Sequence, residues 1–427
     1  MALPGHGHRW AGAALAALCA AALLVVLAMP ARAMEDDWRI YIDADFTHSP
    51  TVGRSIELGV RAALSHHGMA DRISVLVQDH RGNSRRSLDT LKTAALDPRA
   101  IAVVGGMHSP PYLSYNLDIN ALGIPILLPW SSSAPITRSS PAARNWMFRI
   151  AVDNRVALPY LVRDAEARRC RSVARLVVDT PWGLGVALGL GDAIARHGLE
   201  DAGLWRIPVG GGSAVAARIA ARLGEVDCVF LAADSHAAAA ILAELAALPR
   251  PPAVLSHWDI FGAPDLYDRL RVPLSRLDLR ILGTCVLERL ESPGEIDPNL
   301  LASARAFAGV NTLGAIEVPH AFSHAFDAVS LLVGAASAAQ ETRAFGQGIE
   351  RRRGAIRGAL YALPAPVRGL VKTYDQPFSP FSPANPDGHE AIGREDLCLN
   401  RLDAMGRLRP SLAAAPDRSA PGGSHSQ

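Results

Sequence analysis

Lysine is almost absent from this 427-residue chain: only Lys92 and Lys372 occur, and arginine supplies the rest of the 43 basic residues. The arginines are scattered along the chain, and 41 acidic residues balance them. A protein that binds nucleic acid needs a strongly basic face, so the composition argues against a nucleic acid as partner. The length of 427 residues predicts about two domains, and the content of 49% hydrophobic and 20% charged residues predicts that they are globular.

Signatures of catalysis and cofactor binding are also missing. No Gly-x-Ser-x-Gly elbow occurs, which removes the nucleophile pattern of the α/β-hydrolases. The stretch GLGVALG, residues 183–189, comes near a dinucleotide fingerprint, but its spacing is off by one residue and no ribose-binding acid follows. The histidines, including His257, His320 and His324, lack a metal-ligand spacing with matching carboxylates. The sequence therefore predicts no enzyme, no cofactor and no metal site.

One long hydrophobic run is present, and it lies near the N-terminus over residues 10–29. A basic residue precedes it, and Ala31-Arg32-Ala33 follows with small residues at both positions that a signal peptidase requires. The pattern predicts a secretory signal peptide over residues 1–33, cleaved after Ala33. An uncleaved membrane anchor is the alternative, because the run is long for a signal peptide.

Cysteine is scarce, with five residues, one of which lies in the predicted signal peptide. An exported chain meets an oxidising compartment, where disulfides are allowed. Four cysteines can pair in three ways, and their spacing neither selects one pairing nor matches a metal site. We expect most of them to be buried single thiols. The four are Cys170, Cys228, Cys285 and Cys398.

Short apolar runs alternate with helical patterns along the rest of the chain. The order β-α-β-α-β implies a parallel sheet with helices on both faces. The pattern restarts after Asn145 and forms a second unit of similar size, so the predicted fold class is α/β with two doubly wound parallel-sheet lobes. The tail, residues 411–427, is rich in Ala, Pro, Gly and Ser, which predicts disorder. The strands predicted in the first unit are Ile40–Ile42, Ile73–Val77, Ile101–Val104 and Ile124–Leu128. A continuous helix is predicted over residues 112–122, and Gly198 is predicted to end a helix over residues 184–197.

Two strands of the first unit end in turns of small polar residues. Gly105 and Gly106 end one strand, and Ser109 follows just before two prolines, where a helix N-cap belongs. The next strand ends before Ser131, Ser132 and Ser133. Ligands bind at the carboxyl edge of a parallel sheet, and N–H groups at a helix start suit a carboxylate. In the alternative interpretation, the serines only cap a helix and make a turn.

The second unit carries larger side chains at the same edge. Trp182 lies in a turn beside Gly183, where it either packs under the loop or forms a platform for a ligand. Asp234 follows one strand, and Trp258 and Asp259 follow the next. Acidic groups at strand ends could face an ammonium group. In the alternative interpretation, Asp234 caps the helix that follows it, and this interpretation is favoured for Asp234.

These motifs, in their order and spacing, resemble the type I periplasmic solute-binding proteins of ABC importers, of the branched-chain amino acid kind. The resemblance covers roughly Trp38 to Arg409. The late helix has Phe-Asp-Ala where the family often has Tyr-Asp-Ala. The matching stretches are GRSIELGVRAAL, VVGGMHSPP, GIPILLPWSSSAPIT, MFRIAVDNRVALPYLV, VARLVVDTPWGLGVALGLGDAIARHG and AFSHAFDAVSLLVGAA.

The resemblance implies roles for these residues. Ser109 and the 131–133 turn would hold a ligand carboxylate, and Trp182 stands where the family usually has a tyrosine that covers the ligand. Asp259 lies near the family's acid for an α-amino group, which is usually glutamate, and Trp258 could occupy that position instead. This departure leaves the ligand open among amino acids, amides and small carboxylates. Arg149 and Asp153 are expected to organise the crossover between lobes.

The resemblance also implies architecture and function. Residues 36–150 and 284–365 would form lobe 1, residues 151–283 and 366–410 lobe 2, and three hinge strands would join them. The protein would close around a small polar ligand in the periplasm and deliver it to an ABC permease in the inner membrane. A sensor module that feeds a signalling protein is the alternative, and an exported enzyme is less favoured.

Overall fold

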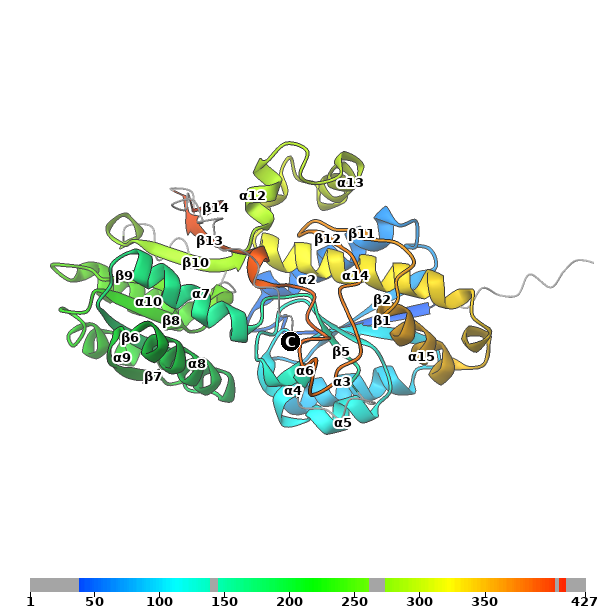
Figure 1. The fold of residues 1–427 in the computed structure, drawn as a ribbon, viewed down its shortest axis with the longest axis horizontal. Helices are drawn as coiled ribbons and strands as arrows, with labels where there is room; N and C mark the ends of the chain where they lie inside the picture. The colour runs from blue at the N-terminus through cyan, green and yellow to red at the C-terminus, as the bar shows by residue number, and fades with distance from the viewer. Residues whose placement is uncertain (1–37, 139–144, 261–272, 404–406, 412–427) are drawn as a thin grey trace, which may run out of the picture.

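The computed structural model describes residues 38–138, 145–260, 273–403 and 407–411 of the chain. They form two lobes side by side, with the first strands of the chain in one lobe and the middle of the chain in the other (Figure 1). Each lobe is built on one large β-sheet, and the two sheets have no strand in common. The predicted signal peptide, and the tail beyond Ser411, lie outside the described residues.

Lobe 1 contains a sheet of five parallel strands in the order β2-β1-β3-β4-β5. Every residue of β3 is buried, as expected for a parallel sheet with helices on both faces. The strands predicted from the apolar runs of the first unit are confirmed. The five are β1 (Trp38–Ala44), β2 (Ile73–Asp79), β3 (Ala100–Val104), β4 (Ile126–Leu128) and β5 (Met147–Arg149).

The core of lobe 1 is organised by the long helix α14 (Pro319–Gln340), which packs along α2 (Pro50–His66). Gly59 permits this close packing, because a Cβ atom there would lie 2.2 Å from the carbonyl oxygen of Phe322. Among the described residues, α14 is the one helix long and apolar enough to cross a membrane, and 83% of its most apolar stretch is buried in the lobe. The apolar residues of α14 therefore pack in the core of lobe 1.

One predicted helix of lobe 1 differs from the structure. The continuous helix expected over residues 112–122 is wrong, because α4 (Ser109–Ser114) ends before α5 (Asn116–Ala121) begins. The Asn116 amide donates to the carbonyl oxygens of Tyr112 and Ile136, so a side chain competes for backbone partners at the break. The other helical segments of this lobe are α3 (Ser84–Leu96), α6 (Pro135–Arg138), α13 (Pro298–Ala308), η4 (Leu313–Ala315), η5 (Arg343–Gly346) and α15 (Ile349–Leu360).

Lobe 2 contains seven strands in the order β14-β13-β10-β9-β8-β6-β7. The five from β7 to β10 are parallel, and β13 and β14 continue the sheet in antiparallel fashion. The strands are β6 (Ser172–Val178), β7 (Glu200–Ile207), β8 (Cys228–Ala232), β9 (Ala253–Ser256), β10 (Leu279–Thr284), β13 (Leu397–Leu402) and β14 (Leu408–Pro410). The helical segments are α7 (Asn154–Ala167), α8 (Pro181–His197), α9 (Gly212–Ala220), α10 (Ser235–Ala247), η2 (Trp258–Ile260) and η3 (Pro273–Arg276).

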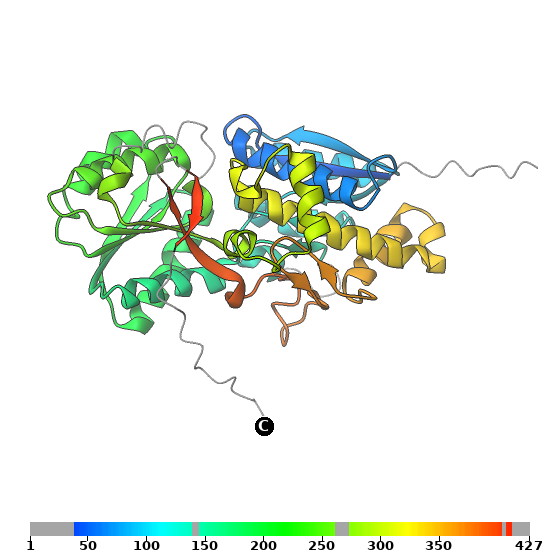
Figure 2. The same ribbon diagram turned by 90° about the horizontal axis from the view of Figure 1, so that it is seen from above.

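Three segments connect the lobes: one follows β5, one follows β10 through α12 (Val286–Glu291), and one passes η6 (Arg394–Asp396) before β13. Figure 2 shows β13, in red, alongside the strands of lobe 2. The segment before it, in orange, lies with lobe 1 and contains the hairpin of β11 (Val367–Arg368) and β12 (Thr373–Tyr374).

The placement of residues 366–396 differs from the expected lobe 2. The Leu370 and Val371 amides and the Tyr374 hydroxyl donate to the buried carboxylate of Asp327 on α14, at 2.6–2.9 Å. Further along, His389 stacks on Phe148 of β5 with ring centroids 4.3 Å apart. These contacts hold residues 366–396 against lobe 1, because this segment supplies the hydrogen-bond donors to the buried carboxylate of α14.

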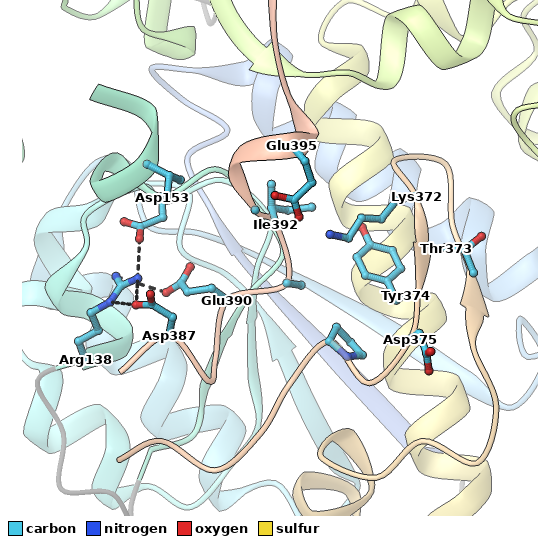
Figure 3. Close-up of a pocket in the computed structure, with 14 residues that line it drawn as sticks. Arg138, Asp153, Lys372, Thr373, Tyr374, Asp375, Asp387, Glu390, Ile392 and Glu395 are labelled. Atoms are coloured by element: carbon cyan, nitrogen blue, oxygen red, sulfur yellow. Dashed lines mark hydrogen bonds and ion pairs between the residues drawn. The ribbon is translucent and has the colours of Figure 1, made fainter. Parts of the chain in front are cut away.

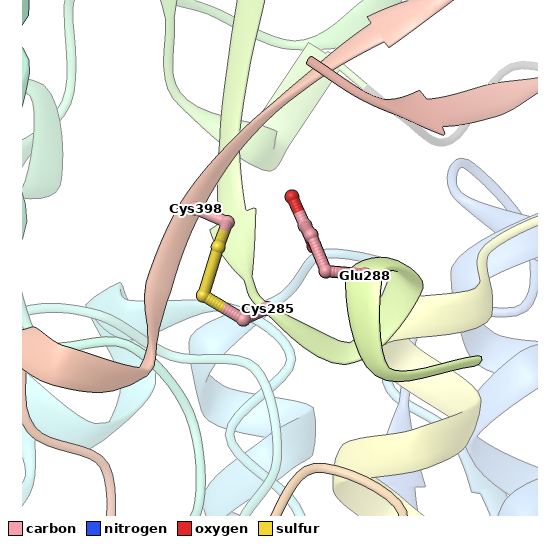
Figure 4. A group of neighbouring side chains, drawn as sticks. All are labelled: Cys285, Glu288 and Cys398. Carbon is pink, nitrogen blue, oxygen red and sulfur yellow. A yellow bond between two sulfur atoms is a disulfide. The ribbon is translucent and has the colours of Figure 1, made fainter. Parts of the chain in front are cut away.

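All four cysteines after residue 33 are paired, so the expectation of buried single thiols is wrong. The disulfide between Cys170 and Cys228 joins the residues just before β6 to the start of β8 within lobe 2. Cys285 and Cys398 join the segment after β10 to β13, at the connection between the lobes (Figure 4). The cysteines of the first pair are 58 residues apart in the sequence, and those of the second pair are 113 residues apart. Only the fold brings each pair into contact.

Candidate functional site

A cavity of about 680 Å³ lies between the lobes and takes its walls from both. Its volume falls in the range of small-molecule sites in proteins. Two of the predicted site residues, Ser133 and Trp258, do not line it. The six that line it are Ser109, Ser131, Ser132, Trp182, Asp234 and Asp259.

The serine turns form the lobe 1 wall, but their hydrogen bonding differs from the prediction. The N-cap position of α4 is His108, so the prediction that Ser109 caps the helix is wrong. Pro110 and Pro111 occupy the next positions and have no N–H groups, so few free donors face the cavity there. The Ser109 hydroxyl oxygen lies 3.4 Å from the Ser133 amide, which donates to it.

Trp182 is positioned by the start of α8. Thr180 is the N-cap and its hydroxyl oxygen accepts from the Gly183 amide at 3.1 Å, which places Trp182 in the first helical turn. A Cβ atom on Gly183 would lie 1.8 Å from the carbonyl oxygen of Val178, so the turn needs glycine there. The indole is 6% exposed, and its Nε1–H donates to the Ser132 hydroxyl oxygen at 2.9 Å. This hydrogen bond runs directly from lobe 2 to lobe 1.

Packed aromatic rings adjoin this contact. His257 packs against Trp182 and Trp258, with ring centroids 5.0 and 3.8 Å away, and Trp258 meets Trp130 edge-on at 6.3 Å. Burial lowers the pKa of His257 to about 3, so this imidazole is neutral, and its Nε2 lies 3.1 Å from the Asn154 side-chain oxygen. Trp258 therefore supports the cavity wall from behind. Trp130, which does line the cavity, was not predicted as a site residue.

The acidic groups of lobe 2 have distinct environments. The Oδ1 atom of Asp234 accepts from the His236 and Ala237 amides at 3.1 and 3.0 Å, so the predicted cap of α10 is confirmed. Burial raises the pKa of Asp259 to about 6; His108 and the Trp130 N–H oppose this shift, and the charge of Asp234 adds to it. Both carboxylates line the cavity, so an ammonium or similar group could meet them there.

Sequence reasoning missed a second group, at the end of β1. Asp45 is 1% exposed, and its carboxylate accepts from the Thr47 and His48 amides at 3.1 and 2.8 Å. His108 Nε2 lies 3.2 Å from the other oxygen. Burial alone would raise the pKa of Asp45, but the bonds from His108 and His48 outweigh it and hold the pKa below its usual range. The signal was available, because Asp45 follows a buried strand whose carboxyl end meets the same edge.

A second hollow of about 430 Å³ lies where segments cross between lobes (Figure 3). The Arg138 guanidinium donates to Asp153 and Asp387 at 2.6 and 2.8 Å and approaches Glu390 at 3.6 Å. Arg149, fully buried, lies 3.1 Å from Glu390 and donates to the carbonyl oxygen of Ser133 at 2.7 Å. These ion pairs tie α6 and β5 to the start of α7, which agrees with the crossover role expected for Arg149 and Asp153.

Among the described residues, one group of neighbouring side chains is of the residue types that can bind a metal ion: Cys285, Glu288 and Cys398 (Figure 4). The two sulfur atoms are bonded to each other, whereas a metal requires thiolates. Burial raises the pKa of Glu288 to about 7, so a proton can neutralise this carboxyl without a cation. The group is therefore a disulfide beside a partly buried acid.

The chain can be compared with known proteins by three features: its two lobes, the three segments that connect them and the cavity between them. A family model described as periplasmic binding protein matches residues 47–255. The chain has the type I periplasmic-binding-protein fold. The fold implied by the resemblance is thereby confirmed.

Solved structures with this fold cover nearly the whole described chain. A periplasmic binding protein type 1 from Bordetella pertussis has a TM-score of 0.70 at 17% identity, and the match covers 88% of this chain and 100% of that chain. A leucine binding protein from Thermotoga maritima has a TM-score of 0.68 at 13% identity, covering 89% and 99%. A solute-binding protein of an ABC transporter from R. palustris, in complex with 4-hydroxybenzoate, has a TM-score of 0.68 at 14% identity, covering 88% and 95%. A search of curated proteins found no match.

These neighbours show that the type I periplasmic-binding-protein fold carries different ligands. The leucine binding and the 4-hydroxybenzoate complex belong to those proteins, and identities of 13–14% transfer the fold alone. They identify no ligand for this chain.

Proposed function

We propose that the protein is a solute-binding protein that captures a small polar ligand, an amino acid or a related compound, in the cavity between its lobes. The observation that carries the proposal is the hydrogen bond from Trp182 to Ser132, because both residues line the cavity and lie on opposite lobes. A ligand that touches both walls stabilises the closed arrangement over an open one by its differential affinity.

Within this proposal the ligand reaches an ABC permease after export of the protein to the periplasm. The predicted signal peptide over residues 1–33 and the two disulfides suit an oxidising compartment. We propose that the cavity binds its ligand and catalyses no reaction. Its polar groups hold other protein groups: Asp45 binds backbone amides and His108, and Ser131 donates to the carbonyl oxygen of Gly106.

The test is a thermal-shift screen of the purified protein, unfolded and refolded to remove endogenous ligand, against amino acids, amides and small carboxylates. A ligand at 100 times its Kd adds about 2.7 kcal/mol to the free energy of unfolding and raises Tm. Cells lacking the protein should then lose uptake of that ligand. No shift with any compound contradicts the binding function, and a shift with unchanged uptake contradicts delivery to an importer.

A matched pair of variants locates the binding. Ser132 lines the cavity, whereas its neighbour Ser133 does not. We expect Ser132→Ala to weaken the affinity several-fold, because one hydrogen bond is typically worth about 1 kcal/mol. Ser133→Ala should bind as the unaltered protein does. Equal affinities for the two variants, measured by calorimetry, would place the ligand elsewhere.

A further inference from the structure

The two disulfides differ in their position and in their access to solvent. The bond between Cys285 and Cys398, here called the hinge disulfide, lies where two of the three connecting segments meet β10 and β13 of lobe 2. Both of its cysteines are partly exposed. Cys170 and Cys228 form the lobe 2 disulfide and are only 6% and 0% exposed. Since a thiolate must reach a sulfur atom to attack it, a thiol in solution can attack the hinge disulfide while the chain is folded.

An acidic side chain lies beside the hinge disulfide. A carboxylate oxygen of Glu288 and the two sulfur atoms all lie within 4.8 Å of one another (Figure 4). The Oε2 atom of Glu288 is buried and has no hydrogen-bond partner in the described part of the chain. Burial and the negative charge of Glu291 raise the pKa of Glu288 to about 7. Near neutral pH, a large share of this carboxyl therefore carries a proton next to the sulfur atoms.

A protonated carboxyl at this place favours cleavage of the disulfide. When a thiolate attacks one sulfur, the other sulfur leaves as a thiolate, whose ordinary pKa is about 8.5. A carboxyl with a lower pKa than the thiol gives its proton to the leaving sulfur favourably. Within the described residues, the lobe 2 disulfide has no such acid grouped with it. Position, access and the neighbouring acid thus all single out the hinge disulfide.

We propose that Cys285, Cys398 and Glu288 form a thiol–disulfide exchange site whose substrate is a dithiol. One thiol of the substrate loses its proton to water and attacks a cysteine sulfur. The disulfide breaks, a mixed disulfide forms, and the leaving cysteine sulfur takes the proton of Glu288. The second substrate thiol gives its proton to Glu288 and attacks the mixed disulfide, and the released cysteine takes a proton from water. Two electrons pass to the protein, and the substrate leaves as a disulfide.

The exchange acts on the connection between the lobes. The hinge disulfide ties the segment after β10 to the segment that enters β13, so reduction removes a covalent link between two of the three connections. The reduced protein has fewer restraints on hinge movement, which is the movement by which such lobes open and close. This role goes beyond ligand capture, and its test needs no ligand.

The first experiment treats the folded mature protein with dithiothreitol, a small dithiol, without denaturant. Free thiols are alkylated at timed intervals, and peptide mass spectrometry gives the reduced fraction of each disulfide. We expect the hinge disulfide to be reduced at least about tenfold faster than the lobe 2 disulfide, because only the former is accessible in the folded chain. Equal rates would show that reduction follows unfolding and would overturn the proposal.

An isosteric variant tests the proton donor. Glu288→Gln keeps a neutral side chain of the same shape but has no acid proton, so it should slow reduction of the hinge disulfide about tenfold or more. The lobe 2 disulfide of the same molecule reports any loss of stability, because local unfolding would accelerate its reduction. Glu341→Gln, at an exposed position after α14, is the matched control. If Glu288→Gln and Glu341→Gln react at the same rate, Glu288 is not the proton donor and the proposed site is wrong.

Amide hydrogen exchange tests the effect on the hinge. We expect faster exchange in α12 and η6 after reduction, and unchanged exchange in α3 of lobe 1, which lies outside the connecting segments. The double variant Cys285→Ser/Cys398→Ser should match the reduced protein without any dithiol. Unchanged exchange in α12 and η6, in both the reduced protein and the double variant, would refute control of the hinge by this disulfide.

Discussion

The hydrogen bond between Trp182 and Ser132 can be removed while an aromatic ring is kept at position 182. Trp182→Phe keeps an aromatic ring against His257 but deletes the Nε1–H that donates across the cavity at 2.9 Å. A single hydrogen bond contributes about 0.5–1.5 kcal/mol net, so the equilibrium between closed and open arrangements should shift about two- to tenfold toward open. The apparent affinity for ligand should fall by up to the same factor, because fewer molecules are competent to bind.

Two measurements check this prediction. Calorimetry gives the affinity, and small-angle X-ray scattering of the free protein should give a larger radius of gyration for Trp182→Phe. Trp182→Ala is less informative, because removing a buried indole costs about 3–5 kcal/mol of stability by itself. Trp205→Phe is the matched control, since Trp205 is a partly buried tryptophan of β7 outside the cavity. If Trp182→Phe and the control have equal affinity and radius, the cross-cavity bond does not govern closure.

Two further predictions concern stability. Replacing Cys285 and Cys398 together by serine should lower the free energy of unfolding by about 2–5 kcal/mol in urea titrations, because their 113-residue separation leaves a long loop unconstrained; an unchanged midpoint would contradict this. Burial raises the pKa of Asp43 to about 7 against hydrogen bonds from Ser87 and Tyr112. An unfolded aspartate has a pKa near 4, so the folded chain binds the extra proton between about pH 4 and 7, and this group's stabilisation is lost as pH rises through that window. Asp43→Asn should remove about 1–3 kcal/mol of the stability difference between pH 5 and 7, and an unaltered difference would refute the assignment.

Local patterns were sufficient for most of the secondary structure. Apolar runs such as Ile101–Val104 became buried parallel strands, and Gly198, predicted as the end of α8, adopts a left-handed conformation with φ of 66°. These features depend on neighbouring residues, whose spacing and backbone preferences are written in the sequence itself. Most of the predicted strand-end residues also reached one cavity, because parallel strands end at a shared edge.

The tertiary structure decided the features that join distant parts of the chain. Sequence could not select the pairing of Cys285 with Cys398, nor direct the donors of residues 370–374 to Asp327 in lobe 1. It also could not show that His108, and not Ser109, occupies the N-cap position of α4 and pairs with Asp45. The sequence by itself determined the α/β lobes, since periodicity and turn residues act locally. The charge and closure of the cavity were decided by the fold, because they depend on groups that meet only when both lobes are formed.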